Sequence, residues 1–252
     1  LRIPLPPLGE QRRIAGILDA ADGLRAKRRE SIALLDTLTQ SIFLDMFGET
    51  KHLEQAPLSD LAEVQGGLTV HSKRSKLPVR APYLRVANVA RGSIDLTEVK
   101  EIGVSDRELR ILALKVHDLL LVEGHGNRME VGRVARWTEP TGTYVHQNHL
   151  IRIRLQGSRV HPVFTEYYLN GSGGRAQVAS VAKTTSGLNT ISISQVRDLK
   201  VPIPPMVQQR EFMERVAVLA HQKETALQSL KVLTALFASL QSRAFHGELQ
   251  GN

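Results

Sequence analysis

The sequence contains no cysteine and only eleven aromatic residues in 252. Without cysteine there can be no disulfide bond, thiolate metal ligand or cysteine nucleophile. The scarcity of aromatic rings disfavours single-stranded nucleic acid as a ligand, because such binding depends on base stacking. The longest apolar stretches are short, as at residues 119–122, and charges interrupt them. The sequence therefore predicts neither a membrane span nor a signal peptide, and we expect a cytoplasmic protein without a membrane partner.

The motifs of the common catalytic sites are also missing. No glycine-rich loop is followed by Lys and Ser or Thr, which excludes ATP hydrolysis at a P-loop. Ser158, Ser172 and Ser186 have glycine neighbours, but none stands in a complete nucleophile-elbow pattern. His146 and His149 lie three residues apart with no carboxylate companion, so we interpret them as polar loop histidines rather than zinc ligands. We expect no catalytic activity of the chain itself.

Positive charge is in excess, and it is segregated along the chain. The sequence has 33 Lys and Arg against 25 Asp and Glu, a net charge of +8 and an isoelectric point near 10.0. Residues 71–91 contain six basic and no acidic residues, and residues 124–197 contain nine basic and three acidic residues. Residues 92–123 between them carry four basic and seven acidic residues. Either cluster alone is typical of a solvated surface, but two that flank an acidic stretch favour contact with a polyanion.

The chain contains an internal repeat with an offset of 198 residues. Residues 1–12 (LRIPLPPLGEQR) align without a gap on residues 199–210 (LKVPIPPMVQQR), and the match continues to Phe47 on Phe245. The prolines of each copy fix an extended, polyproline-like entry that cannot belong to a helix interior, so a helix is predicted just after each. Gly48 and Gly247 stand where the two helices should stop.

Each copy carries heptad rows typical of a coiled coil. The rows of the first copy are Ile14, Ala21, Arg28, Leu35 and Ile42, with Ile17, Leu24, Ser31 and Leu38 as the companion row. The rows of the second copy are Phe212, Leu219, Ala226, Leu233 and Leu240, beside Val216, Lys223, Leu230 and Phe237. Two such helices could form the core of an ordinary helical domain. An antiparallel pair with a separate domain between the helices fits better, because the middle of the chain lacks the pattern.

Residues 49–198 are predicted to form a mixed, mostly β domain. Alternating apolar and polar residues predict strands over residues 83–89, 118–123, 131–137 and 150–155, and a short helix is predicted over residues 163–169. Polar and turn-forming residues mark joints at 49–57 and 184–199. The predicted fold class is α+β, with this domain between a first conserved helix (residues 1–48) and a second (residues 199–252).

Clusters of amide, imidazole, hydroxyl and basic side chains in the middle region suit DNA recognition. Asn and Gln can bond adenine through two hydrogen bonds and Arg can do so with guanine, while Lys and hydroxyl groups bond phosphates. Each cluster alone is equally typical of turns, so the prediction of duplex DNA binding depends on their acting together. The candidate DNA-binding residues are Lys73, Arg74, Lys76, Arg85, His125, Asn127, Arg128, Gln147, Asn148, His149, Lys183, Thr184, Thr185, Ser186 and Asn189.

Several segments together resemble a known protein family. Residues 3–14, 41–48 and 199–245 look like the conserved regions of the specificity subunit of type I restriction-modification systems. Residues 84–89, 118–124, 146–150 and 183–189 are similar to that family's target-recognition domains. The resemblance implies the C-terminal half of such a subunit, with one recognition domain between two conserved helical regions that form an antiparallel coiled coil. Because the chain starts with Leu1 rather than Met, we expect a piece of a longer polypeptide. The missing first recognition domain leaves two alternatives, such a fragment or a natural half-size subunit that must dimerise.

The resemblance also implies a function and partners. The expected function is sequence-specific binding of double-stranded DNA, in which the chain reads one half of a bipartite target and docks methyltransferase subunits and, through them, restriction subunits. S-adenosylmethionine, ATP and Mg²⁺ are expected on those partner subunits in a bacterial or archaeal cytoplasm. A second copy of the chain, or an N-terminal half, would read the other half of the target.

Two rival hypotheses remain open at this point. The first is a coiled-coil scaffold or interaction protein whose basic domain binds another acidic partner. The second is a nuclease with an unrecognised carboxylate site.

Overall fold

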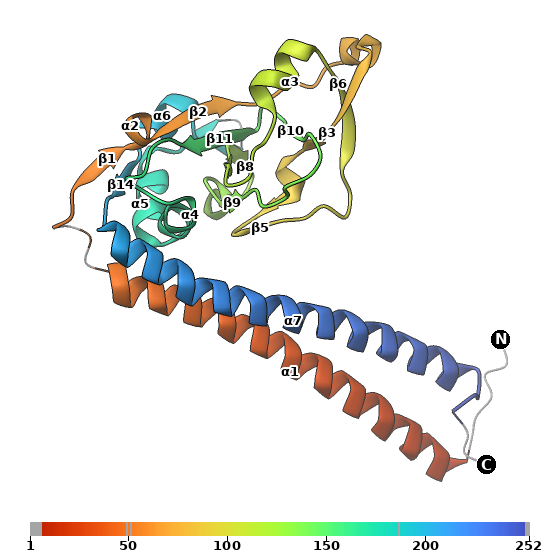
Figure 1. Ribbon diagram of the computed structural model, residues 1–252. Coiled ribbons are helices and arrows are strands. Elements are labelled where there is room, and N and C mark those ends of the chain that lie inside the picture. The colour runs from red at the N-terminus through yellow and green to blue at the C-terminus, as the bar shows by residue number, and fades with distance from the viewer. Residues whose placement is uncertain (1–6, 49, 51, 186, 250–252) are drawn as a thin grey trace. The chain divides into compact units, whose positions relative to one another are not determined.

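The computed structural model describes residues 7–48, 50, 52–185 and 187–249 (Figure 1). The chain divides into two compact units. The helical unit comprises Leu1–Asp45 and Glu214–Asn252, and the central unit comprises Met46–Met213. No helix among the described residues is long and apolar enough to cross a membrane.

Two helices of 40 residues each, about 60 Å long, dominate the helical unit. Helix α1 (Leu8–Phe47) begins directly after Pro7, and α7 (Met206–Phe245) begins directly after Pro205. The predicted helix starts are thus confirmed; the extended entry of the first copy, residues 1–6, lies outside the described residues. Both helices end beside the predicted glycines, and Gly247 takes a left-handed φ of 73° while its amide donates to the carbonyl of Ala244.

The two helices pack antiparallel, as predicted. Arg13, near the start of α1, donates to the carbonyl of Leu249 beyond the end of α7. Further along, the Lys223 ammonium lies 2.5 Å from the carboxylate of Asp36. The Arg25 guanidinium lies 4.3 Å from the centre of the Phe237 ring, a cation–π contact within the seam.

The seam of α1 differs from the predicted one in its companion row. Both predicted rows of α7 and the first row of α1 are shielded from solvent, which confirms them. The companion row of α1 is wrong at Leu24 and Leu38, which are 54% and 47% exposed. The residues that take their place are Leu18, Arg25, Ile32, Thr39 and Met46. They are the repeat equivalents of Val216, Lys223, Leu230, Phe237 and Ala244, so both helices use the same face.

A four-stranded antiparallel sheet forms the centre of the central unit. Its order is β2 (Ala62–Gly66), β11 (Leu150–Leu155), β7 (Leu119–Val122) and β9 (Val134–Arg136). All four residues of β7 are fully buried, because β7 lies inside the sheet and both of its faces are covered. Helix α4 (Pro162–Asn170) packs against β9, where Asn170 exchanges two hydrogen bonds with the backbone of Val134. Helix α5 (Ser172–Val181) follows α4 directly.

A second, three-stranded sheet places β3 (Val79–Leu84) between β10 (Val145–His146) and β6 (Lys100–Val104). Helix α3 (Asp106–Leu112) follows β6 and is capped by Ser105. Short elements complete this region of the chain: η1 (Ser72–Lys76), η2 (Val86–Asn88), and the hairpin of β4 (Val89–Ala90) with β5 (Ser93–Ile94).

The first and last strands of the central unit pair with each other. β1 (Gln55–Pro57) pairs antiparallel with β14 (Lys200–Pro202), so Gln55 lies opposite Pro202. The two short helices α2 (Leu58–Leu61) and α6 (Ile193–Asp198) lie just inside this strand pair. The predicted joints therefore contain regular structure. Helix α6 was missed, although Ser192 and Gln195 form a capping box at its start.

The remaining predictions for the middle region vary in success. The strand over residues 150–155, the strand at residues 118–123 and the helix at residues 163–169 are confirmed. The strand over residues 131–137 is reduced to β9. The strand over residues 83–89 is wrong after Leu84, because the Asn88 side chain accepts from the Arg85 amide and closes the turn η2. The α+β fold class is confirmed.

Candidate nucleic-acid interface

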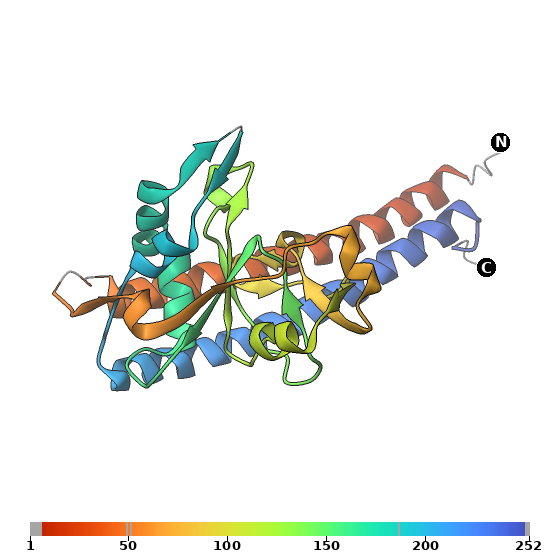
Figure 2. The same cartoon turned by 90° about the horizontal axis from the view of Figure 1, so that it is seen from above.

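The short strand β8 (Gly124–His125) is where segments distant in the sequence meet. It pairs with β13 (Leu188–Thr190), which in turn pairs with β12 (Lys183–Thr185). Figure 2 shows the β12–β13 hairpin beside the yellow-green loop that contains β8. Just before β8, the amide of Glu123 donates to the carbonyl of His149, and the Glu123 carboxylate lies 3.1 Å from the His149 ring. The candidate segments 125–128, 147–149 and 183–189 therefore converge on β8.

Within the hairpin, Asn189 holds the fold together. It is buried, its Oδ1 accepts from the Thr184 hydroxyl at 2.7 Å, and its Nδ2 donates to the carbonyl of Gly126 at 3.0 Å. Asn189 therefore ties the hairpin to the β8 loop and has no free amide group to offer a base. Lys183 is exposed, and its ammonium forms no ion pair with any residue that the structure describes. Of the remaining candidates here, Ser186 and the Thr185 side chain lie outside the described residues.

The β8 loop orders its own polar side chains. The ring of His125 accepts from the amide of Asn127, and the Asn127 Oδ1 accepts from the amide of Met129, both at 3.0 Å. These bonds cap the turn η3 (Arg128–Glu130). Arg128 is exposed and uses one guanidinium nitrogen on the carbonyl of Ala179 at the end of α5. Asn127 and Arg128 thus keep donors available at the surface.

Gln147 and Asn148 are held by their backbone alone. The Gln147 amide donates to Leu84 at 2.9 Å, and the Asn148 amide donates to Leu68 at 2.8 Å. Their side-chain amides make no hydrogen bond within the described part of the chain, and both are only partly buried. A fixed backbone with an unengaged amide suits a residue that reads base edges. His149, next to them, is exposed beside Glu123.

His146 corrects an interpretation made from the sequence. It lies in β10 with a fully buried ring, not in a polar loop, and its Nδ1 is 3.1 Å from the carbonyl of Leu150. Burial, with Arg152 nearby, lowers the pKa of His146 to about 4. Over the described ranges, no group of three or more His, Asp or Glu side chains could hold a metal ion.

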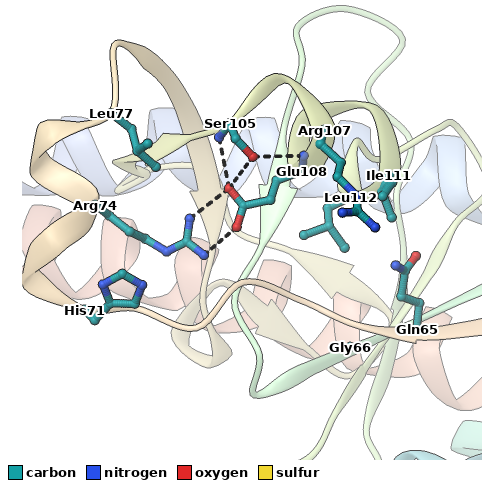
Figure 3. Close-up of a pocket in the computed structure, with 10 residues that line it drawn as sticks. All are labelled: Gln65, Gly66, His71, Arg74, Leu77, Ser105, Arg107, Glu108, Ile111 and Leu112. Atoms are coloured by element: carbon teal, nitrogen blue, oxygen red, sulfur yellow. Dashed lines mark hydrogen bonds and ion pairs between the residues drawn. The ribbon is translucent and has the colours of Figure 1, made fainter.

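In the first basic stretch, residues 71–91, the candidate lysines are exposed and the candidate arginines pair with acidic residues. Arg74 is 6% exposed, and its guanidinium bonds the Glu108 carboxylate at 2.7 and 3.2 Å (Figure 3). It also donates to the carbonyls of Thr69 and Gly103. This pairing with Arg74 lowers the pKa of Glu108 to about 2 and fixes η1 to α3. Because its donors are occupied, Arg74 is removed from the set of phosphate contacts.

Arg85 also pairs with an acid, because its guanidinium lies 3.2 Å from the carboxylate of Glu98. Lys73 and Lys76 differ from both arginines. They are exposed, and no described acidic residue pairs with them. Of the four candidates in this stretch, the two lysines therefore retain accessible charge.

Two arginines beside the β8 loop were missed as site residues. The Arg91 guanidinium donates to the carbonyl of Met129 at 2.9 Å, and that of Arg175 lies 3.9 Å from the Met129 sulfur. Arg91 was counted in the first basic stretch and Arg175 in the second, but their separation in the sequence concealed that they meet. They are joined in three dimensions by their contacts with Met129.

Comparison with known proteins finds sequences and solved structures that are similar to this chain. No family model matches the chain. The EcoKI specificity subunit of Escherichia coli strain K12 is 28% identical, in an alignment that covers 99% of this chain and 58% of that subunit. The StySPI specificity subunit of Salmonella potsdam is 25% identical over the same shares. This chain is homologous to type I restriction enzyme specificity subunits. It spans about 58% of the length of these relatives.

Solved structures share the fold at lower identity. The S subunit of a type I restriction-modification system from M. genitalium superposes with a TM-score of 0.60 at 16% identity, covering 94% of this chain and 61% of that one. A chain of another type I restriction-modification system gives a TM-score of 0.59 at 18% identity, with 98% of this chain and 62% of that one covered. The architecture of two long helices and a β-rich central unit is therefore that of S subunits.

Proposed function

We propose that this chain binds double-stranded DNA sequence-specifically and reads one half of a bipartite target for a type I restriction-modification complex. The observation that carries the proposal is the convergence of three distant polar segments on β8, with the amides of Gln147 and Asn148 unengaged. Homology to specificity subunits along the whole chain supports the same function.

Within this proposal, bases and phosphates are contacted by different residues. Gln147, Asn148 and Asn127 read base edges, because their amides combine a donor with an acceptor. Lys183, Lys73 and Lys76 contact phosphates, which sets the register of the unit on the duplex. Arg74, Arg85 and Asn189 position these residues through their bonds to Glu108, Glu98 and Gly126 and do not touch DNA.

The helical unit has a separate part in the proposed function. We expect it to dock methyltransferase subunits and, through them, restriction subunits, and to fix the distance to the unit that reads the other half of the target. That second unit is a second copy of this chain or an N-terminal half. S-adenosylmethionine, ATP and Mg²⁺ would bind those partner subunits in a bacterial or archaeal cytoplasm, and the chain itself would catalyse no reaction.

Selection from a random duplex pool tests the proposal directly, and a single enriched half-site is the expected result. Alanine at Gln147 or Asn148 should then weaken binding of the selected duplex about 10- to 100-fold, since a good amide–base pair contributes roughly 1–3 kcal/mol of discrimination. Binding of random-sequence duplex should hardly change. Gln156→Ala is the matched control, because Gln156 is an exposed amide just beyond the end of β11. Equal losses on both duplexes would remove Gln147 and Asn148 from the base-reading set.

The same experiment separates the rival functions. A scaffold with a basic domain would enrich no sequence from the pool. A nuclease would cut the selected duplex when the purified chain is incubated with it and Mg²⁺ in the absence of partner subunits. Intact DNA with a selected sequence favours the recognition function over both.

A further inference from the structure

A cluster of three arginines, of which Arg128 and Arg175 are exposed and Arg91 is partly buried, surrounds Met129 in the turn η3. Arg91 follows β4, Arg128 belongs to η3 and Arg175 lies in the first turn of α5. Arg91 and Arg175 both contact Met129, one at its carbonyl and the other at its sulfur. Arg128 and Arg175 line one pocket between η3 and α5. The three side chains come from segments far apart in the sequence but share one surface, which we call the arginine cluster.

The charge of the arginine cluster is not balanced by the residues around it. Glu130 is an acid beside the cluster, and its carboxylate is 3.0 Å from the guanidinium of Arg133. Arg133 is itself buried and also donates to the carbonyls of Val86 and Val89. The ion pair of Glu130 with Arg133 therefore stabilises the packed structure. None of the three clustered arginines forms an ion pair with an acid in the described chain. Burial and the neighbouring charge of Arg175 lower the pKa of Arg91.

The surroundings add to the preference for an anion. Helix α5 starts with Ser172, Gly173 and Gly174, and no side chain caps its first turn. The positive end of the helix dipole therefore lies beside Arg175 without a side-chain acceptor. Ser172 lines the same pocket and offers a hydroxyl group. Guanidinium groups bind phosphate oxygens through two parallel hydrogen bonds, which makes arginine well suited to a phosphate diester.

The position of the cluster identifies which phosphate it would bind. Met129 follows Asn127 and Arg128, and the Asn127 side chain caps the same turn. A phosphate held by the cluster would therefore lie next to the base edges that the β8 loop reads. We infer that Arg91, Arg128 and Arg175 form a binding site for one backbone phosphate of duplex DNA, which sets the register of the β8 loop. This inference rests on the proposed function.

The salt dependence of DNA binding tests the inference with little risk to the fold. Arg175 is exposed and its guanidinium contacts the Met129 sulfur, so Arg175→Gln should fold normally. With a random-sequence duplex as the probe, the slope of log K against log salt concentration should become shallower by about 1, as expected when one phosphate contact is lost. Affinity should fall roughly tenfold, and by the same factor on the selected duplex, because a phosphate contact carries no sequence information.

Two further variants sharpen the test. Arg107→Gln removes the same charge from exposed α3 and should leave the slope unchanged. Arg175→Lys retains a charge but not the planar donor pair, and it should restore the slope while recovering only part of the affinity.

The outcomes are distinct. An unchanged slope for Arg175→Gln, with normal DNA binding by the wild-type chain, would refute the phosphate site and leave the proposed function intact. A tenfold loss on the selected duplex alone would also refute it, because that result describes base reading. Failure of the wild-type chain to bind any duplex would overturn the proposed function and this inference together.

Discussion

The helical unit and the central unit are built on different principles. In the helical unit, rows of residues seven apart form a seam that continues through 40 residues of each helix. In the central unit, the candidate site is assembled by pairings between segments such as β8 and β13, which lie more than sixty residues apart. The first arrangement depends on local periodicity and the second on tertiary structure. The comparison teaches where sequence patterns are sufficient and where they are not.

The largest expected effect is on the aromatic core of the central unit. Phe164 is fully buried, and its ring centre lies 4.9 Å from that of Phe47. Phe164→Ala should lower the free energy of unfolding by about 3–5 kcal/mol, because it leaves a cavity among large side chains. Urea unfolding followed by circular dichroism measures this change. Phe245→Ala, at a position that is 68% exposed, should change stability by less than about 0.5 kcal/mol. Similar losses in both variants would refute the burial assigned to Phe164.

A smaller effect should depend on pH. Burial of Glu166 outweighs its bonds to Arg136 and raises its pKa from 4.5 to about 7. Between these two values the unfolded chain releases the proton while the folded chain keeps it, so the contribution of Glu166 to stability falls as pH rises from about 4.5 to 7. The side chain of the Glu166→Gln variant cannot ionise. The free energy of unfolding of this variant should therefore rise relative to that of the wild type by up to about 3 kcal/mol between pH 4 and pH 8.

Urea unfolding of both proteins at the two pH values gives this difference. Taking the difference between variant and wild type cancels other titrating groups, including His146. A constant difference across the pH range would mean that folding does not shift the pKa of Glu166.

The smallest effect tests the seam of α1. Leu18 lies in the seam while Leu24, on the same helix, is 54% exposed. Leu18→Ala should lower the free energy of unfolding by roughly 1–2 kcal/mol, less than for a fully buried leucine because Leu18 is only partly covered. Leu24→Ala should cost less than about 0.5 kcal/mol. Thermal unfolding of the two variants ranks them, and the reverse order would restore the seam predicted from the sequence.

The error in that seam has a physical cause. Residue type alone favours Leu24 and Leu38 over Arg25 and Thr39, because leucine is the ordinary occupant of a coiled-coil seam. Tertiary contacts override this preference. Arg25 is stabilised by the face of the Phe237 ring and by Asp22 at 3.0 Å, and the Thr39 hydroxyl bonds the carbonyl of Leu35. The correct row was nevertheless encoded in the sequence, because subtracting the repeat offset from the α7 rows gives it.

The candidate site was predictable in composition but not in the role of each residue. Side-chain chemistry was enough to select the segments that meet at β8. It could not distinguish Arg74 from Lys73, or Asn189 from Asn148. Those distinctions depend on partners such as Glu108, 34 positions away, and the carbonyl of Gly126, 63 positions away. An arginine or asparagine becomes structural when the fold supplies such a partner, and no local pattern reveals it.

The pairing of β1 with β14 has a consequence for how the chain folds. Residues on α1 and α7 that meet in the seam are separated by the whole central unit, and closing so long a loop is entropically costly. Once Gln55 lies opposite Pro202, that loop is already closed, and the two helices are joined as if by a short hairpin. Helix pairing then becomes a nearly local event. We expect refolding to be limited by formation of the central unit, with the helices zipping together rapidly afterwards.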